Sequence, residues 1–273
     1  MSLINVSNLT FAYEGGDKIF DSVSFQIDTD WKLGFIGRNG RGKTTFLNLL
    51  LGKYEYMGNI SAGVEFEYFP YEVNEAADTL DALRNAALRD LNPRFEQWKL
   101  LRELSLLDIR EDVLYRPFKT LSRGERTKAL LGALFCKDDH FLLLDEPTNH
   151  LDMHARKILG RYLRSKKGFI LVSHDREILD TCVDHVLSIN KTNIEVQRGN
   201  FSSWWENKRR QDEMERAENE RLRKDIKRLS EAARRTSNWS DQVEKTKTGT
   251  GHHVDRGRKG FCFDLYSPFS VPN

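Results

Sequence analysis

The chain contains the run Gly37-Arg38-Asn39-Gly40-Arg41-Gly42-Lys43-Thr44-Thr45, which fits the spacing G-x-x-x-x-G-K-[ST]. Its three glycines let the backbone curl, so that successive N–H groups turn toward one anion. Lys43 can then reach the β- and γ-phosphates of a nucleotide as a point charge, and the Thr44 hydroxyl can coordinate Mg²⁺. We therefore expect this run to bind the phosphates of a nucleoside triphosphate.

The residues on either side of the run are those that such a loop requires. Residues 31–36 form an apolar run typical of a buried strand, and residues 45–51 have the pattern of a helix that ends at Gly52. A strand, a glycine-rich loop and a helix in this order direct the positive end of the helix dipole at the phosphates. The alternative, a glycine-rich turn with a solvated lysine, does not explain this context.

Composition limits the kind of protein that this chain can be. With 273 residues, it corresponds to one domain with an appendage or to two small domains. The net charge is only +2 although 31% of the residues are charged, so any basic surface has to be local. The cysteines Cys136, Cys182 and Cys262 are odd in number and far apart, which favours unreactive thiols in a reducing cytosol. We expect no signal peptide and no membrane span, and hence a cytoplasmic protein.

The hydrophobic pattern predicts an α/β fold of the P-loop type, with a β-rich part and a helical insertion. Residues 3–36 and 58–69 favour strands, whereas residues from about 73 to 116 include Leu80 and Leu83 at helical spacing and Pro93 at the start of a second helix. Further along, short apolar runs alternate with helical segments. This alternation indicates βαβ units around a mostly parallel sheet.

Residues 201–248 predict one long charged helix. No Gly or Pro occurs from residue 201 to 247, and residues 206–235 carry 11 basic and 8 acidic side chains. A narrow apolar stripe, which includes Met214 and Ile226, is typical of half of a helical hairpin or coiled coil. Residues 249–273 show no periodicity, and we expect an irregular, non-native tail in which His252 and His253 set no metal-binding geometry by themselves.

Polar residues follow two of the predicted parallel strands. Asp145 and Glu146 end one of them, and His174 follows another. Because the carboxyl ends of parallel strands line the ligand crevice, Asp145 would hold Mg²⁺, Glu146 would polarise the attacking water, and His174 could contact the γ-phosphate. An acidic N-cap and a structural histidine are the plain alternatives. Ser122 and Gly124 begin a helix whose free N–H groups can also bind a γ-phosphate.

These motifs resemble those of an ABC ATPase, in order and over residues 1 to about 200. Residues 37–45 are similar to the Walker A motif, 121–125 to the ABC signature, 141–146 to Walker B, 149–152 to the D-loop and His174 to the H-loop. Asn149-His150 resembles the ABC-F subfamily, and 169–176 with 199–204 are similar to its antibiotic-resistance ribosome-protection branch. The resemblance implies a P-loop domain with an antiparallel β subdomain, ATP and Mg²⁺ as ligands, ATP hydrolysis, and a charged interdomain linker that acts on the ribosome and its RNA.

The resemblance leaves several alternatives open. Tyr13 resembles the aromatic residue that stacks on adenine, although a core aromatic is a close alternative, and Tyr71 stands where many ABC ATPases have a metal-sensing glutamine. An ABC site is closed by the signature of the opposite domain, so either two copies pair or the chain is the first half of a longer protein. An ATPase subunit of a membrane transporter and a module that binds ATP without hydrolysis are the competing functions.

Overall fold

A six-stranded sheet organises the first of two structural units, residues 1–210. The structure is a computed structural model, and it describes residues 2–86, 97–137, 140–190 and 193–248. In spatial order the strands of this sheet are β5 (Glu65–Phe69), β6 (His140–Asp145), β7 (Phe169–Val172), β3 (Lys32–Ile36), β8 (His185–Asn190) and β9 (Asn193–Arg198). The first five run parallel, and β9 pairs antiparallel with β8. The predicted, mostly parallel sheet is confirmed; β9 is an addition that the hydrophobic pattern did not indicate.

A second sheet of three antiparallel strands has the order β2 (Lys18–Asp28), β1 (Leu3–Ala12) and β4 (Met57–Ser61). Strand-forming residues occur in two runs, 3–6 and 9–13, but β1 is continuous. Its register with β2 shifts between Val6 and Leu9, and Asn8 takes the left-handed backbone conformation with φ +50°. This irregularity interrupts the alternation of apolar residues, which is why one strand looks like two in the sequence.

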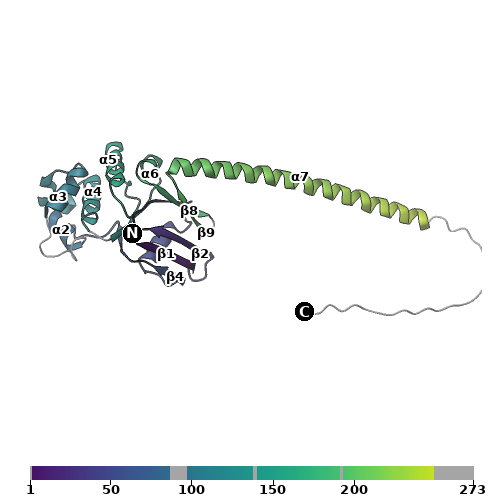
Figure 1. Ribbon diagram of the computed structural model, residues 1–273, viewed down its shortest axis with the longest axis horizontal. Helices are drawn as coiled ribbons and strands as arrows, with labels where there is room; N and C mark the ends of the chain where they lie inside the picture. The colour runs from purple at the N-terminus through teal and green to yellow at the C-terminus, as the bar shows by residue number, and fades with distance from the viewer. Residues whose placement is uncertain (1, 87–96, 138–139, 191–192, 249–273) are drawn as a thin grey trace, which may run out of the picture. The chain divides into compact units, whose positions relative to one another are not determined.

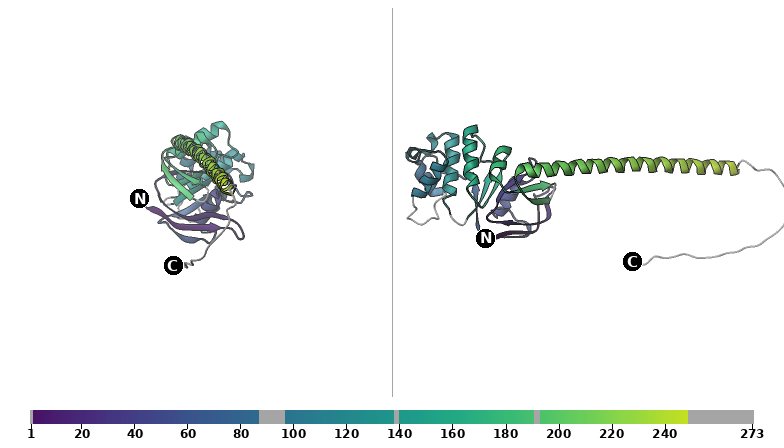
Figure 2. Two further views of the ribbon diagram at one scale, coloured as in Figure 1. Left: turned by 90° about the vertical axis from the view of Figure 1, so that its right-hand side faces the viewer. Right: turned by 45° about the horizontal axis from the view of Figure 1, so that its top comes forward.

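The two faces of the six-stranded sheet carry different cores, because successive side chains of a strand point to opposite faces. On one face, Phe141 and Leu143 of β6 pack with α1 (Lys43–Leu50) and the antiparallel sheet. On the other, Leu142 and Leu144 pack against helices. Those helices are α2 (Thr79–Ala86), α3 (Gln97–Leu106), α4 (Arg123–Leu134), α5 (Met153–Arg164) and α6 (Arg176–Cys182). Within this unit, α2, α3 and α4 gather at the end remote from the antiparallel sheet (Figures 1 and 2).

The predicted helical insertion comprises α2, α3 and two short 3₁₀ helices, Glu111–Tyr115 and Phe118–Thr120. Pro93 lies outside the described residues. A buried polar contact joins the insertion to the core: Tyr162 of α5 donates a 2.6 Å hydrogen bond to Glu103 Oε2 of α3, and the ammonium of Lys166 also contacts this oxygen. The carboxylate is thus paired where burial would otherwise make it costly.

The predicted charged helix is confirmed as α7 (Phe201–Thr248), whose first ten residues belong to the first unit. There Phe201 is buried, and the guanidinium of Arg176 lies 5.6 Å from its ring centroid and 5.1 Å from that of Trp205. Cation–π contacts of this kind attach the start of α7 to α6. The predicted domain boundary at residue 200 thus falls one residue before this helix, whereas the first unit extends to Arg210.

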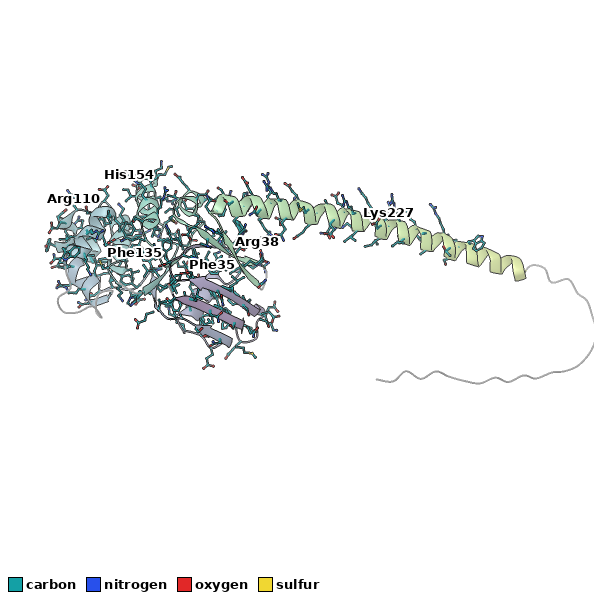
Figure 3. All side chains as sticks on the ribbon, in the orientation of Figure 1. Phe35, Arg38, Arg110, Phe135, His154 and Lys227 are labelled. Atoms are coloured by element: carbon teal, nitrogen blue, oxygen red, sulfur yellow. The ribbon has the colours of Figure 1, made fainter. Side chains whose placement is uncertain are left out.

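In the second unit, the described residues 211–248 are helical throughout. Its predicted apolar stripe is exposed, with 71% of Met214 and 66% of Ile226 accessible to solvent. Charged side chains such as Lys227 extend into solvent along the helix (Figure 3). No helix among the described residues combines the length and apolarity needed to cross a bilayer. The predicted tail, with His252, His253 and Cys262, lies outside the described residues.

Candidate nucleotide-binding site

The glycine-rich loop lies between the end of β3 and the start of α1, as predicted. Gly40 and Gly42 have φ values of +77° and +96°, which L side chains rarely adopt. A Cβ at Gly42 would also lie 2.4 Å from Cγ2 of Ile19. Gly42 is the N-cap of α1 and no side chain caps this helix, so the N–H groups of its first turn are open to an anion.

Lys43 is held inside the curve of this loop. Its Nζ donates a 2.9 Å hydrogen bond to the carbonyl oxygen of Gly37, and it lies 3.5 Å from the Arg38 carbonyl oxygen and 3.4 Å from Asn39 Oδ1. Partial burial lowers the pKa of this ammonium, and the nearby carboxylates of Glu146 and Asp145 oppose that shift. The loop therefore positions one cation beside the uncapped start of α1.

The hydroxyl of Thr44 donates a 2.8 Å hydrogen bond to Asp145 Oδ2. Tyr68, at the end of β5, donates a second hydrogen bond of 3.1 Å to the same oxygen. Tyr68 is not among the predicted site residues. Its only sequence signal was its place near the end of a predicted strand, where parallel strands line a crevice.

Glu146 and His174 meet at the ends of β6 and β7, as their positions predicted. Nε2 of His174 lies 3.2 Å from Oε1 of Glu146, but within the part of the chain that the structure describes this buried oxygen has no partner with hydrogen-bond geometry. Burial is the main cause that raises the pKa of the Glu146 carboxyl, and the neighbouring His174 acts in the opposite direction. Glu146 also takes the left-handed conformation, with φ +50°. A strained residue with an unsatisfied carboxylate oxygen is typical of a functional site.

These side chains surround one hollow. It is lined by Tyr13, Ile19, Asn39, Gly40, Gly42, Lys43, Thr44, Thr45, Asp145, Glu146, Val172 and His174. Predicted residues from four separate segments thus come together. Gly37, Arg38 and Arg41 belong to the loop but do not line the hollow, although Gly37 and Arg38 orient Lys43 through their carbonyl groups.

Tyr13 lies at the edge of the hollow with 45% of its surface exposed. Its hydroxyl is 3.0 Å from Thr45 Oγ1, and its ring packs edge-on against Phe11 and Tyr54, with centroids 5.1 and 5.8 Å away. An exposed ring beside the phosphate loop is compatible with a base-stacking role, which stays a prediction.

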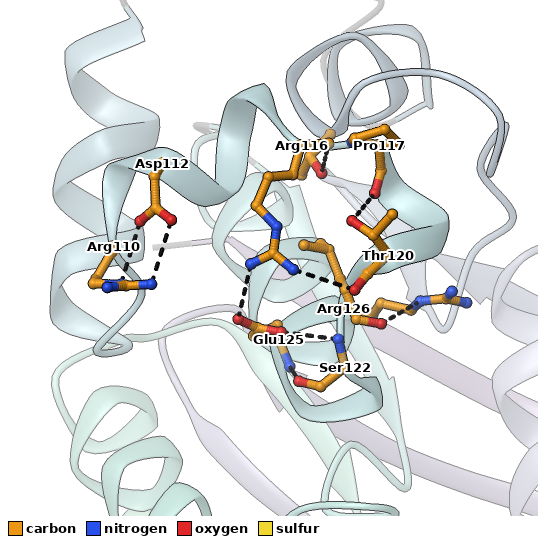
Figure 4. A network of polar contacts seen from close by, with 10 residues as sticks. Arg110, Asp112, Arg116, Pro117, Thr120, Ser122, Glu125 and Arg126 are labelled. Atoms are coloured by element: carbon orange, nitrogen blue, oxygen red, sulfur yellow. Dashed lines mark hydrogen bonds and ion pairs between the residues drawn. The ribbon is translucent and has the colours of Figure 1, made fainter.

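Ser122 and Gly124 do not line this hollow. Ser122 instead forms a capping box at the start of α4, in which its Oγ accepts from the Glu125 N–H at 3.2 Å and its own N–H donates to Glu125 Oε2 at 2.8 Å (Figure 4). That they serve the site of a partner domain instead stays a prediction.

The residues present fit a nucleotide with a divalent cation. The uncapped helix start and the ammonium of Lys43 suit phosphate, while the Thr44 hydroxyl and the Asp145 carboxylate are oxygen ligands of the kind that Mg²⁺ prefers. Tyr71, in contrast, contributes nothing here. Its hydroxyl donates to the carbonyl oxygen of Leu130 at 3.1 Å, on the α4 side of the sheet.

Comparisons with known proteins agree with this geometry. Residues 20–149 match the family model described as ABC transporter. The chain is 33% identical over 208 residues to the ribosome protection protein VmlR of Bacillus subtilis, covering 73% of this chain and 36% of that protein. It is 31% identical over 209 residues to ABC transporter F family member 3 of Arabidopsis thaliana, covering 74% and 29%. The chain spans about a quarter to a half of the length of the curated relatives it matches.

Among solved structures, the chain resembles MJ0796, a bacterial ABC transporter cassette described as a dimer. The TM-score is 0.61 at 15% sequence identity, and the match covers 71% of this chain and 98% of that one. Identity at this level shows the fold alone. The predicted fold, an ABC-type P-loop domain with an antiparallel β subdomain and helices, is thereby confirmed.

Proposed function

We propose that this chain carries an ABC-type ATP-binding domain, which binds ATP with Mg²⁺ and hydrolyses it. The loop from Gly37 to Thr45 would bind the phosphates, with Lys43 on the β- and γ-phosphates. Thr44 and Asp145 would hold the Mg²⁺, which neutralises charge on the phosphates. Tyr13 would stack on the adenine ring.

The observation that carries this proposal is the arrangement of Glu146 and His174 on the rim of the phosphate loop. A buried carboxylate oxygen without a hydrogen bond suits a group that accepts one from the attacking water. The raised pKa of Glu146 makes it a better base than an exposed carboxylate. His174, 3.2 Å away, would orient this carboxylate and contact the γ-phosphate.

A second ABC domain would complete the site. Ser122 and Gly124 lie outside the hollow that contains Lys43, so the signature segment of a partner domain would have to cover the γ-phosphate. That domain would come from a second copy or from the remainder of a longer protein. The dimeric cassette among the similar structures supports this arrangement.

We also propose that the domain is of the ABC-F type and acts on the ribosome in translation or antibiotic resistance. Support comes from the relatives named as an F family member and a ribosome protection protein, and from α7, whose mixed charges suit an RNA-facing linker. An ATPase subunit of a membrane transporter is the alternative, and it gives α7 no role.

A single-turnover assay of the wild type against Glu146→Gln tests the hydrolysis proposal. We expect the variant to bind ATP but to hydrolyse it roughly 10²–10⁴ times more slowly, the range for loss of a general base. Equal, near-zero rates in both proteins, with ATP still bound, would leave only a binding module. Sedimentation of Glu146→Gln with ATP and Mg²⁺ tests the pairing of domains, since a persistent monomer would contradict a homodimer.

Ribosome binding is tested separately, by pelleting with ribosomes over a range of salt concentrations. Contacts between basic side chains and RNA phosphates should weaken steeply as salt is added. No association at any salt concentration would refute the ribosomal role, while co-purification with a membrane protein would favour the transporter alternative.

A further inference from the structure

Asp145 is oriented by two hydroxyl groups from distant parts of the chain. Tyr68 and Thr44 both donate to its Oδ2, at 3.1 and 2.8 Å, and they lie 77 and 101 positions away in the sequence. Thr44 is part of the loop motif, whereas Tyr68 belongs to none of the motifs described above. Its contact therefore calls for a separate explanation.

Strand register explains why Tyr68 reaches this carboxylate. In the parallel pair of β5 and β6, Tyr68 is opposite Leu143, two residues before Asp145. Since side chains two apart share a face, Tyr68, Leu143 and Asp145 point to the same side of the sheet, the side covered by α1. The phenol then extends along the strand direction toward the carboxylate.

The phenol of Tyr68 donates to Asp145, and a second contact involves its ring. The ammonium of Lys53, which follows α1, lies 5.2 Å from the centre of the Tyr68 ring and makes a cation–π contact with it. The ring is thus fixed by contacts that do not depend on its hydroxyl.

We infer that Tyr68 is a positioning residue that holds the Asp145 carboxylate in the orientation from which it binds Mg²⁺, an inference that rests on the proposed function. Groups that hydrogen-bond to a metal ligand fix its orientation, and their loss weakens metal binding. Tyr68 takes part in the site although Tyr71, at the position of the usual glutamine, is turned to the opposite face and bonds to Leu130.

The two tyrosines provide a matched test. Tyr68→Phe and Tyr71→Phe each remove one hydroxyl, three residues apart, but only the first hydroxyl contacts Asp145. The affinity of the full chain for a fluorescent ATP analogue would be measured over a range of Mg²⁺ concentrations. It would also be measured in the presence of EDTA. Thermal unfolding of each variant would be recorded in parallel.

We expect Tyr68→Phe to raise the half-saturating Mg²⁺ concentration roughly tenfold or more, the effect of losing a bond to a metal ligand. Its affinity for the analogue in EDTA should stay within about twofold of the wild type. Tyr71→Phe should leave the Mg²⁺ midpoint unchanged and lower only the unfolding temperature. This contrast separates a positioning role from a structural one.

A Mg²⁺ midpoint for Tyr68→Phe that is unchanged, or lower, would overturn the inference, as would an equal rise in Tyr71→Phe. A wild type that binds the analogue but shows no dependence on Mg²⁺ would also overturn it, with nucleotide binding intact. A wild type that binds no nucleotide under any condition would instead refute the proposed function, so the two failures are distinguishable.

Discussion

The hydroxyl of Thr44 and the carboxylate of Asp145 are joined by a 2.8 Å hydrogen bond although they lie 101 positions apart in the chain. The bond links the start of α1 to the end of β6. It is possible because β6 and β3 are both in the parallel sheet, with β7 between them, so their carboxyl ends meet at one edge. The loop and the acidic pair thereby form one site.

Lys43→Met should reduce the affinity for ATP roughly 10- to 100-fold, since a hydrogen bond to a charged group contributes about 1.5–3 kcal/mol. Titration with a fluorescent ATP analogue measures this change. Lys18→Met is the control, because Lys18 is exposed and pairs only with Asp21 among the contacts described. Equal affinities in wild type and Lys43→Met would contradict a phosphate-binding role for the loop.

Gly42→Ala should destabilise the protein more than Gly40→Ala. Both positions have positive φ, so each alanine incurs backbone strain of roughly 1–2 kcal/mol. Only the Cβ at position 42 meets a neighbour, Cγ2 of Ile19 at 2.4 Å, whereas nothing lies within 4 Å of one at position 40. Chemical denaturation measures the difference in unfolding free energy; equal losses would mean that the loop relaxes around the added methyl group.

Ser122→Ala should lower the unfolding free energy by about 1 kcal/mol at neutral pH, the usual effect of losing an N-cap. The hydrogen bonds from the Ser122 backbone and side chain lower the pKa of Glu125. A carboxyl whose pKa is lower in the folded state stabilises the fold at pH values above its ordinary pKa of 4.5. This stabilisation is lost as the pH falls through the folded-state pKa. The effect of Ser122→Ala should therefore shrink in acid.

Denaturation of Ser122→Ala at neutral and acid pH checks this dependence. Ser105→Ala, at an exposed position within α3, is the control and should change stability by less than about 0.5 kcal/mol. A loss for Ser122→Ala that is the same at both pH values would show that the capping box does not depend on the charge of Glu125.

Glu146→Gln should stabilise the fold at neutral pH. Because burial raises the folded-state pKa of this carboxyl above 4.5, the folded state holds the proton more tightly than the unfolded state. The unfolding free energy of the wild type then falls as the pH rises from 4.5 through the raised pKa. The uncharged amide of Glu146→Gln does not titrate, so the variant avoids this loss of stability. We expect a Tm increase of roughly 2–4 °C at pH 7 and a smaller one near pH 4.

Thermal unfolding at both pH values measures this effect. Glu14→Gln serves as the control because Glu14 is an exposed carboxylate in a turn. If Glu146→Gln melts at the same temperature as the wild type at pH 7, the carboxylate has no net desolvation cost in the folded protein.

Most of the fold and much of the candidate site could be predicted because their signals are local. The capping box at Ser122 needs only residues three apart, and the apolar run of β7 shows by itself that both faces are covered. The continuity of β1 could not be predicted, since the bulge at Asn8 is set by pairing with β2, which no residue of β1 reveals.

The sequence pattern also could not predict which of two neighbouring tyrosines contributes to the candidate site. Tyr68 and Tyr71 are three residues apart and chemically identical, yet one hydroxyl bonds to Asp145 and the other to Leu130. Tyr71 stands at the position where many ABC ATPases have a glutamine, yet it is the tyrosine that lies away from the hollow. Which of the two reaches the site depends on the face of β5 from which its side chain extends.

By itself the sequence determined the glycine-rich loop between a strand and a helix, most of the alternation of strands and helices, and the charged helix α7, because glycine conformations, capping and hydrophobic period act between neighbours in the chain. Tertiary structure alone determined that Tyr68 and Thr44 share one oxygen of Asp145, and that Glu146 keeps a buried oxygen without a hydrogen bond to any described residue. These relationships depend on the register of parallel strands, which is set by contacts between residues far apart in sequence.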